Sequence, residues 1–175
     1  MKARWVVTLV ALIGLSACSP SLNWRTVLVE QLAALLPCKP DHAERQVELG
    51  GAQRTLSMWG CEAGGALFAV SHVRLDATAS TAAVITAWQL ATLRNISQVP
   101  DNAHRELPFK APALADQAAI AGTMLSAHGK RPDGQVVQAQ LAWFSRDADV
   151  YHLAVFAPNL TPDMVDTFFT ELRWQ

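Results

Sequence analysis

The chain has 175 residues, of which 51% are hydrophobic and 17% are charged, with 14 Lys and Arg against 15 Asp and Glu. A chain this rich in apolar residues is typical of a globular domain rather than an intrinsically disordered one. The small net charge and the absence of a basic cluster or a run of five like charges argue against a nucleic-acid partner.

The N-terminus has the three parts of a secretory signal. Lys2 and Arg4 precede an apolar run of eleven residues, 5–15, and small residues then lead to Cys18. Eleven helical residues extend over about 16 Å, roughly half of the ~30 Å hydrocarbon core of a bilayer. The run therefore favours a signal peptide over a permanent membrane-spanning helix.

The four residues Leu15-Ser16-Ala17-Cys18 resemble the lipobox of bacterial lipoproteins. The resemblance implies that a diacylglycerol is attached to the Cys18 thiol, that the chain is cut before Cys18, and that acyl chains anchor it stably to a membrane. In that family an Asp after the Cys retains the protein at the inner membrane, so Ser19 implies the outer membrane, facing the periplasm. An ordinary signal peptide cut after Ala17 and an uncleaved inner-membrane anchor are the alternatives.

This interpretation divides the chain into a signal peptide (1–17), a lipidated tether (18–23) and one globular domain (24–175). Removing 17 of 175 residues leaves 158, which suffices for one well-formed core. Removal of Lys2 and Arg4 leaves 12 basic residues against 15 acidic ones, a net charge of −3.

The first half of this domain reads as a series of strands at 24–30, 45–49, 54–61 and 66–75, with glycine pairs at 50–51 and 64–65 suited to hairpin turns. The segment 31–36 stays open between helix and strand, because its composition favours helix while Pro37 and Pro40 would stop one. Cys38 and Cys61 are an even pair without C-x-x-C spacing and predict a structural disulfide. A bridge closing this 24-residue loop would stabilise the fold by roughly 3 kcal/mol.

Residues 78–96 change character and predict a long helix that packs on one face of the sheet, capped by Thr78 or Ser80. Its apolar face contains Val84, Ile85, Trp88, Ala91 and Ile96. Three prolines make 99–113 a loop, with a short edge strand at 105–109.

Further strands are predicted at 117–128, 135–145 and 150–157, with Gly122 marking a bulge or a close approach. Along 135–145, Trp143 and Phe144 fall on opposite faces. Thr161, Pro162 and Asp163 suit the start of a last helix. Its apolar face contains Val165, Phe168, Phe169 and Leu172.

The order of strands, helix, strands and helix predicts an α+β fold. We expect one antiparallel sheet of about six or seven strands with the middle helix and the C-terminal helix packed on it. The proline-flanked segment 37–41 before a meander, the middle helix, the three-strand run and the final helix resemble the PsbP/Mog1-type fold over 24–175. That family carries no single activity, so the resemblance implies a fold and not a function.

Catalytic motifs are missing from the sequence. The five histidines have no metal-ligand spacing, and there is no G-x-S-x-G, Walker or G-x-G-x-x-G motif. We therefore predict no catalytic residue, no metal and no cofactor. Of the aromatic residues, Trp88, Trp143 and Phe144 are the candidates for a ligand or partner surface.

The sequence thus favours a lipid-anchored envelope protein that acts as a non-enzymatic binding or interaction module. Its partners would be the membrane, through Cys18, and either an envelope protein or an apolar small ligand. An enclosed apolar cavity would favour the small ligand. The alternatives are a small hydrolase-type enzyme with a site around His152 and a carboxylate, and a purely structural envelope protein.

Overall fold

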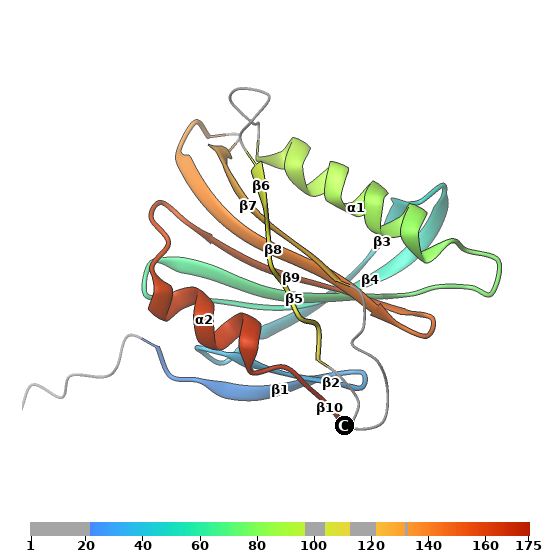
Figure 1. The fold of residues 1–175 in the computed structure, drawn as a ribbon, viewed down its shortest axis with the longest axis horizontal. Helices are drawn as coiled ribbons and strands as arrows, with labels where there is room; N and C mark the ends of the chain where they lie inside the picture. Colours follow the sequence, from blue (N-terminus) through green and yellow to red (C-terminus); the bar gives the residue numbers. More distant parts are fainter. Residues whose placement is uncertain (1–21, 97–103, 113–121, 132) are drawn as a thin grey trace, which may run out of the picture.

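The structure is a computed structural model that describes residues 22–96, 104–112, 122–131 and 133–175. The predicted signal peptide, the lipobox and Ser19 lie outside these residues. In these ranges the chain forms a large antiparallel sheet, a small antiparallel sheet and two helices (Figure 1). The predicted α+β class is confirmed.

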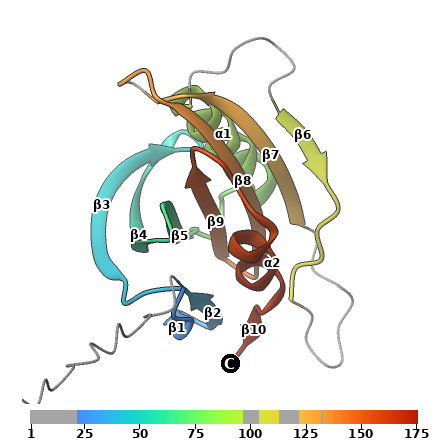
Figure 2. The ribbon, with the colours of Figure 1, turned by 90° about the vertical axis from the view of Figure 1, so that its left-hand side faces the viewer.

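The large sheet has seven strands in the order β3-β4-β5-β9-β8-β7-β6. Figure 2 shows that it is strongly curved, with β3 and β6 at its two edges. Gly50, Gly51, Gly64 and Gly65 all have positive φ values, between 59° and 79°, at the β3–β4 and β4–β5 turns where L side chains are disfavoured. The strands are β3 (Asp41–Leu49), β4 (Ala52–Ala63), β5 (Ala66–Arg74), β6 (His104–Leu107), β7 (Gly122–Lys130), β8 (Val136–Arg146) and β9 (Asp149–Ala157).

The small sheet consists of β1 (Arg25–Val29), β2 (Leu32–Leu36) and β10 (Arg173–Trp174). The segment 31–36, for which the sequence left both helix and strand open, therefore contains a strand. Glu30, at a φ of 52°, lies in the tight turn that pairs β2 with β1. Four of the five side chains of β2 are buried, and three of them, Leu32, Ala34 and Leu36, belong to the core. This tertiary burial outweighs their helix propensity. The predicted antiparallel sheet of six or seven strands is confirmed by the large sheet. The second, smaller sheet and the short β10 within it were not predicted.

The two helices, α1 (Thr81–Asn95) and α2 (Pro162–Thr170), lie on opposite faces of the large sheet (Figure 1). The predicted Ser80 cap is confirmed, since its Oγ accepts a hydrogen bond from the Ala83 N–H. Thr161 occupies the N-cap of α2 but makes no capping bond with its side chain. No helix in the described ranges is long and apolar enough to cross a membrane.

Two hydrophobic cores result, one on each face of the large sheet. Alternate residues of β8 show the division, because Trp143 lies in the core under α1 and Phe144 in the core under α2 and the small sheet. Strand β9, at the centre of the sheet, is buried on both faces.

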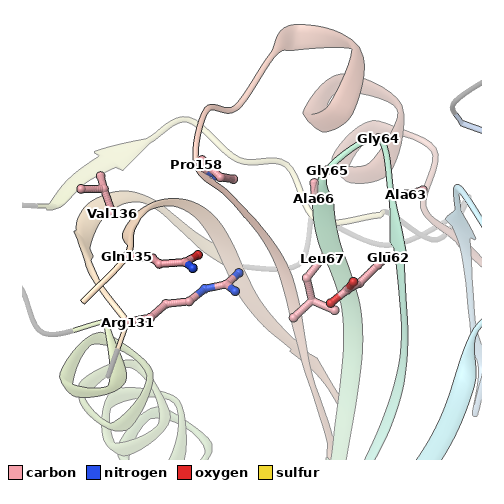
Figure 3. Close-up of a pocket in the computed structure, with 10 residues that line it drawn as sticks. All are labelled: Glu62, Ala63, Gly64, Gly65, Ala66, Leu67, Arg131, Gln135, Val136 and Pro158. Carbon is pink, nitrogen blue, oxygen red and sulfur yellow. The ribbon is translucent and has the colours of Figure 1, made fainter. Parts of the chain in front are cut away.

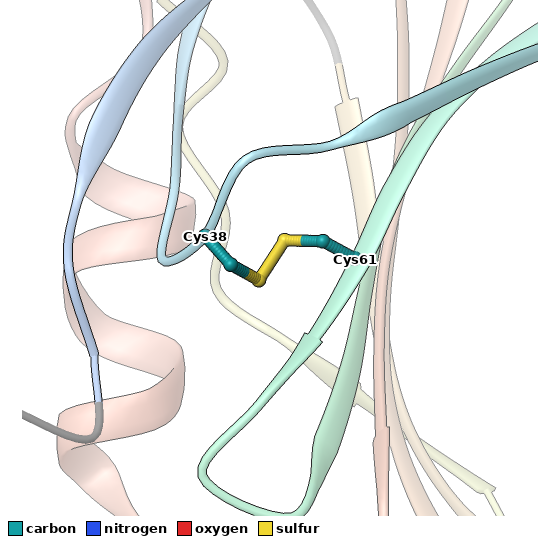
Figure 4. The surroundings of a disulfide bond; sticks show 2 residues. All are labelled: Cys38 and Cys61. Carbon is teal, nitrogen blue, oxygen red and sulfur yellow. A yellow bond between two sulfur atoms is a disulfide. The ribbon is translucent and has the colours of Figure 1, made fainter.

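A disulfide joins Cys38, in the segment between β2 and β3, to Cys61 in β4 (Figure 4). The predicted pairing is confirmed. The bond connects the small sheet covalently to the large one, at the point where the chain passes between them. It therefore fixes β1 and β2 against the meander that follows.

Two predicted strands have different limits. Strand β3 begins at Asp41 rather than at residue 45, because it pairs with β4 over its whole length. Strand β7 begins at Gly122, and residues 117–121 of the predicted strand lie outside the described residues. A Cβ at Gly122 would lie 2.8 Å from the Phe109 ring, so this glycine serves a close approach rather than a bulge.

Candidate functional site

A cavity of about 370 Å³ lies between α1 and the large sheet. Its walls come from α1, from β3, β4, β5, β8 and β9 of the sheet, and from the end of β7. The large apolar side chains that line it are Val47, Leu49, Leu56, Met58, Leu67, Trp88, Ile96, Val137 and Phe156.

Small side chains create this space. On the sheet, Ala69 of β5 pairs with Ala154 of β9. The next pair on the same face, two residues along β5, is Ser71 with His152. On the helix, Ala91 and Thr92 face the same cavity. Small residues on both walls leave a gap that the large side chains around it do not fill.

Two glycines hold α1 close to the sheet at its ends. A Cβ at Gly50 would lie 2.7 Å from Val84 Cγ2, near the start of the helix. A Cβ at Gly129 would lie 2.2 Å from the carbonyl oxygen of Ile96, which accepts a 2.7 Å hydrogen bond from the Lys130 N–H. The helix is thus docked at both ends, and its C-terminal half, from Trp88 to Asn95, lines the cavity.

His152 forms part of the cavity floor and is enclosed by two tryptophans. Its ring stacks on Trp143 at 4.5 Å and 12° and lies 5.2 Å from the ring of Trp88. The residue is 7% exposed, and its Nε2 has no hydrogen-bond partner among the described residues. Burial lowers the pKa of His152 to about 3, because the charged imidazolium would lose its hydration. The residue is therefore neutral at physiological pH.

The alternative of an enzyme around His152 requires a neighbouring carboxylate, and within the described residues none forms a hydrogen bond or ion pair with it. A buried histidine–carboxylate pair lies instead on the opposite face. There His72 Nε2 lies 2.8 Å from Asp149 Oδ1, and Arg74 approaches the same carboxylate at 3.5 Å. Both members of this pair are more than nine-tenths buried, which fits a structural polar cluster.

The structure separates the three aromatic residues that the sequence offered as a binding surface. Trp88 lines the cavity, whereas Trp143 and Phe144 are 0% exposed. The prediction that these last two residues form a surface is wrong. Adjacent positions on a strand covered on both faces put one in each core, and neither reaches solvent.

Most residues of the cavity were not recognised from the sequence. The pattern that could have revealed them is the row of small side chains facing α1, such as Ala69 and Ser71 on β5 and Ala154 on β9. The alternation of side chains along a strand shows which of its residues share a face. It does not give the β5–β9 pairing, which joins segments about 85 residues apart in the chain.

A second cavity, also of about 370 Å³, lies between the β4–β5 turn and the segment after β7 (Figure 3). Arg131 and Leu67 line both cavities. Figure 3 shows the Arg131 side chain reaching from the β7–β8 connection toward Leu67 and Glu62. The two cavities are therefore neighbours that share a charged wall.

No family model matches this sequence, and no curated protein matches it. Among solved structures, the chain is similar to the crystal structure of PA94, a protein of unknown function from Pseudomonas aeruginosa. The two chains are 11% identical, and the match covers 82% of this chain and 86% of the other with a TM-score of 0.38. A likeness at this level carries no functional argument.

Proposed function

We propose that this chain is a lipid-anchored protein of the cell envelope, facing the periplasm, that binds an apolar small molecule in the cavity under α1. The observation that carries the proposal is the cavity itself. Its volume of about 370 Å³ falls within the usual range for small-molecule sites, about 300–1,000 Å³. Its lining is mainly aliphatic and aromatic, and its buried histidine is neutral.

The exposed surface favours a small ligand over an envelope protein. The large hydrophobic side chains that are exposed in the described ranges are Leu28, Met58, Leu90 and Val136. They come from β1, β4, α1 and β8, and none is aromatic. The cores of protein interfaces are typically enriched in aromatic residues. The exposed apolar side chains here are not aromatic, and each comes from a different element.

The position of the cavities relative to the N-terminus also supports the proposal. Leu22 lies beside Gly64, with its Cδ2 3.3 Å from where a Cβ would be, and Gly64 lines the second cavity. Cys18 precedes Leu22 by only four residues. Lipidation of Cys18 would therefore keep this end of the domain near a bilayer, in which apolar small molecules concentrate.

Binding is tested with N-phenyl-1-naphthylamine, an uncharged probe whose fluorescence rises in apolar surroundings. The protein is the Cys18→Ser chain, which cannot carry a thioether-linked lipid and can be handled without detergent. Thr92→Trp places a large ring in the cavity, whereas Thr86→Trp makes the same change at an exposed position of α1 outside it. The two substitutions have the same cost in helix propensity.

We expect saturable binding by the parent chain and by Thr86→Trp, and its loss in Thr92→Trp with unchanged far-ultraviolet circular dichroism. Absence of binding by the parent chain, or equal binding by both tryptophan variants, would contradict the proposal.

The anchor is tested by the intact mass of the protein taken from native membranes. A chain that begins at Cys18 and carries acyl groups is expected. A chain that still carries residues 1–17, or that is cut before Cys18 but unmodified, would contradict the lipid anchor. Separation of inner from outer membranes then tests the sorting that Ser19 implies.

A further inference from the structure

Two arginines stand out in the otherwise apolar lining of the cavity. Arg45 comes from the edge strand β3, and Arg131 comes from the segment that follows β7. Within the described ranges, neither guanidinium forms a hydrogen bond or an ion pair with a side chain. The remaining charged group of the lining is Glu48, so the cavity carries a net charge of +1 with two unpaired cations.

We propose that the ligand is an anionic single-chain amphiphile, a fatty-acid-like carboxylate whose alkyl chain fills the cavity and whose head group pairs with Arg45 and Arg131. This inference rests on the proposed function and adds the chemical class of the ligand. The shape of the site fits one chain rather than two, because about 370 Å³ is near the lower limit for small-molecule sites.

Charge complementarity carries the choice of a carboxylate. A guanidinium stays protonated at all relevant pH values, and its planar array of N–H donors matches the two oxygens of a carboxylate. Arg45 is exposed and Arg131 is half-buried, so solvent screens part of this attraction. His152 contributes no charge of its own, since it is enclosed by Trp88 and Trp143.

The fold of the sheet also explains why the sequence alone does not indicate this pair of arginines. Arg45 faces α1 because it shares a face of β3 with Val47 and Leu49, both of which pack toward the helix. Arg131 is 86 residues further on. Figure 2 shows the curved sheet with β3 on one side of α1 and β7 on the other. Arg45 of β3 and Arg131, which follows β7, line the same cavity.

The test compares three probes that share a ten-carbon chain: decanoate, decan-1-ol and decylammonium. Binding to the Cys18→Ser chain is measured by calorimetry below the concentrations at which the probes aggregate. Arg45→Gln, Arg131→Gln and the double variant remove the proposed partners of the carboxylate. Arg25→Gln, at an exposed position of β1, is the matched control because it removes an arginine that does not line the cavity.

We expect decanoate to bind about tenfold more tightly than decan-1-ol, and decylammonium to bind most weakly. The double variant should bring the decanoate to decanol ratio close to one while decanol affinity is unchanged. Arg25→Gln should leave the ratio as it is, and Thr92→Trp should abolish binding of both probes.

Equal binding of decanoate and decan-1-ol would overturn this inference while leaving the proposed function intact. Preference for decylammonium, or a decanoate preference that survives in the double variant, would overturn it in the same way. Absence of binding by all three probes would remove the proposed function together with the inference.

Discussion

Gly129→Ala gives a sharp test of how α1 is docked. The backbone of Gly129 is not in the positive-φ region, so alanine is conformationally allowed there. Where the new methyl group has open space around it, such a Gly→Ala substitution should stabilise the protein by about 0.4–1 kcal/mol, because alanine restricts the conformations of the unfolded chain. The structure predicts the opposite sign, since the new Cβ would lie 2.2 Å from the Ile96 carbonyl oxygen and 2.5 Å from Ile96 Cγ2.

The expected cost follows from what must move. Displacing Ile96 disturbs the Lys130 N–H···O=C bond at the end of α1, a net loss of about 0.5–1.5 kcal/mol. Ile96 is 3% exposed, and full exposure of such a side chain would cost about 1.5–3 kcal/mol. Both groups relax only partly, so the destabilisation should be smaller than the sum of the two losses, about 1–3 kcal/mol, the range for overpacked cores.

Urea unfolding of the Cys18→Ser chain, followed by circular dichroism, measures this change. With a slope of about 2 kcal/mol/M, the midpoint should fall by roughly 0.5–1.5 M. Gly60→Ala is the control: it also lies in a strand without positive φ, but its new Cβ would meet no atom closer than 3.2 Å. Its midpoint should change much less. A Gly129→Ala chain as stable as its parent would refute the docking of α1 described above.

Three further predictions concern the disulfide and the two buried histidines. The double variant Cys38→Ser/Cys61→Ser should lose about 3 kcal/mol of unfolding free energy, as measured by urea unfolding, because the 24-residue loop is no longer closed in the unfolded chain. His152→Phe should flatten the pH dependence of stability. Unfolded histidine, with a pKa of about 6.5, binds a proton that buried His152, with a pKa of about 3, does not. The parent chain should therefore lose stability relative to this variant as pH falls from about 6.5 to 4, and the difference should be constant above about pH 7.5 in urea midpoints measured across the pH series. Asp149→Ala should cost about 3 kcal/mol in the same assay, because it leaves His72 buried without its partner. Unchanged midpoints in any of these comparisons would contradict the corresponding contact.

Several local features could be read from the sequence because short-range chemistry determines them. The glycine pairs at 50–51 and 64–65 predict hairpin turns, since only glycine readily adopts their positive φ values. The alternation along β8 separates Trp143 from Phe144, and the face of α1 that contains Val84 and Trp88 follows from helical periodicity. The disulfide followed from two cysteines in a chain whose first residues predict a secretory signal.

Other features depended on which segments meet in space. Whether 31–36 is helix or strand was decided by burial against the large sheet, which outweighed local propensity. The same segment is paired by β10, whose two residues from the far end of the chain have no pattern of their own. Trp143 and Phe144 were expected to offer a surface, but a central strand covered on both faces leaves none.

The candidate site shows the same division. The sequence by itself determined the class of fold, the disulfide pair and the amphipathic face of α1, because each depends on residue type and spacing within a short segment. Only the tertiary structure decided that Ala69, Ala154 and Thr92 leave a cavity and that Arg45 and Arg131 line it. The size and lining of a cavity depend on the register of non-adjacent segments and on the curvature of the sheet. Neither can be inferred from the periodicity of a short segment.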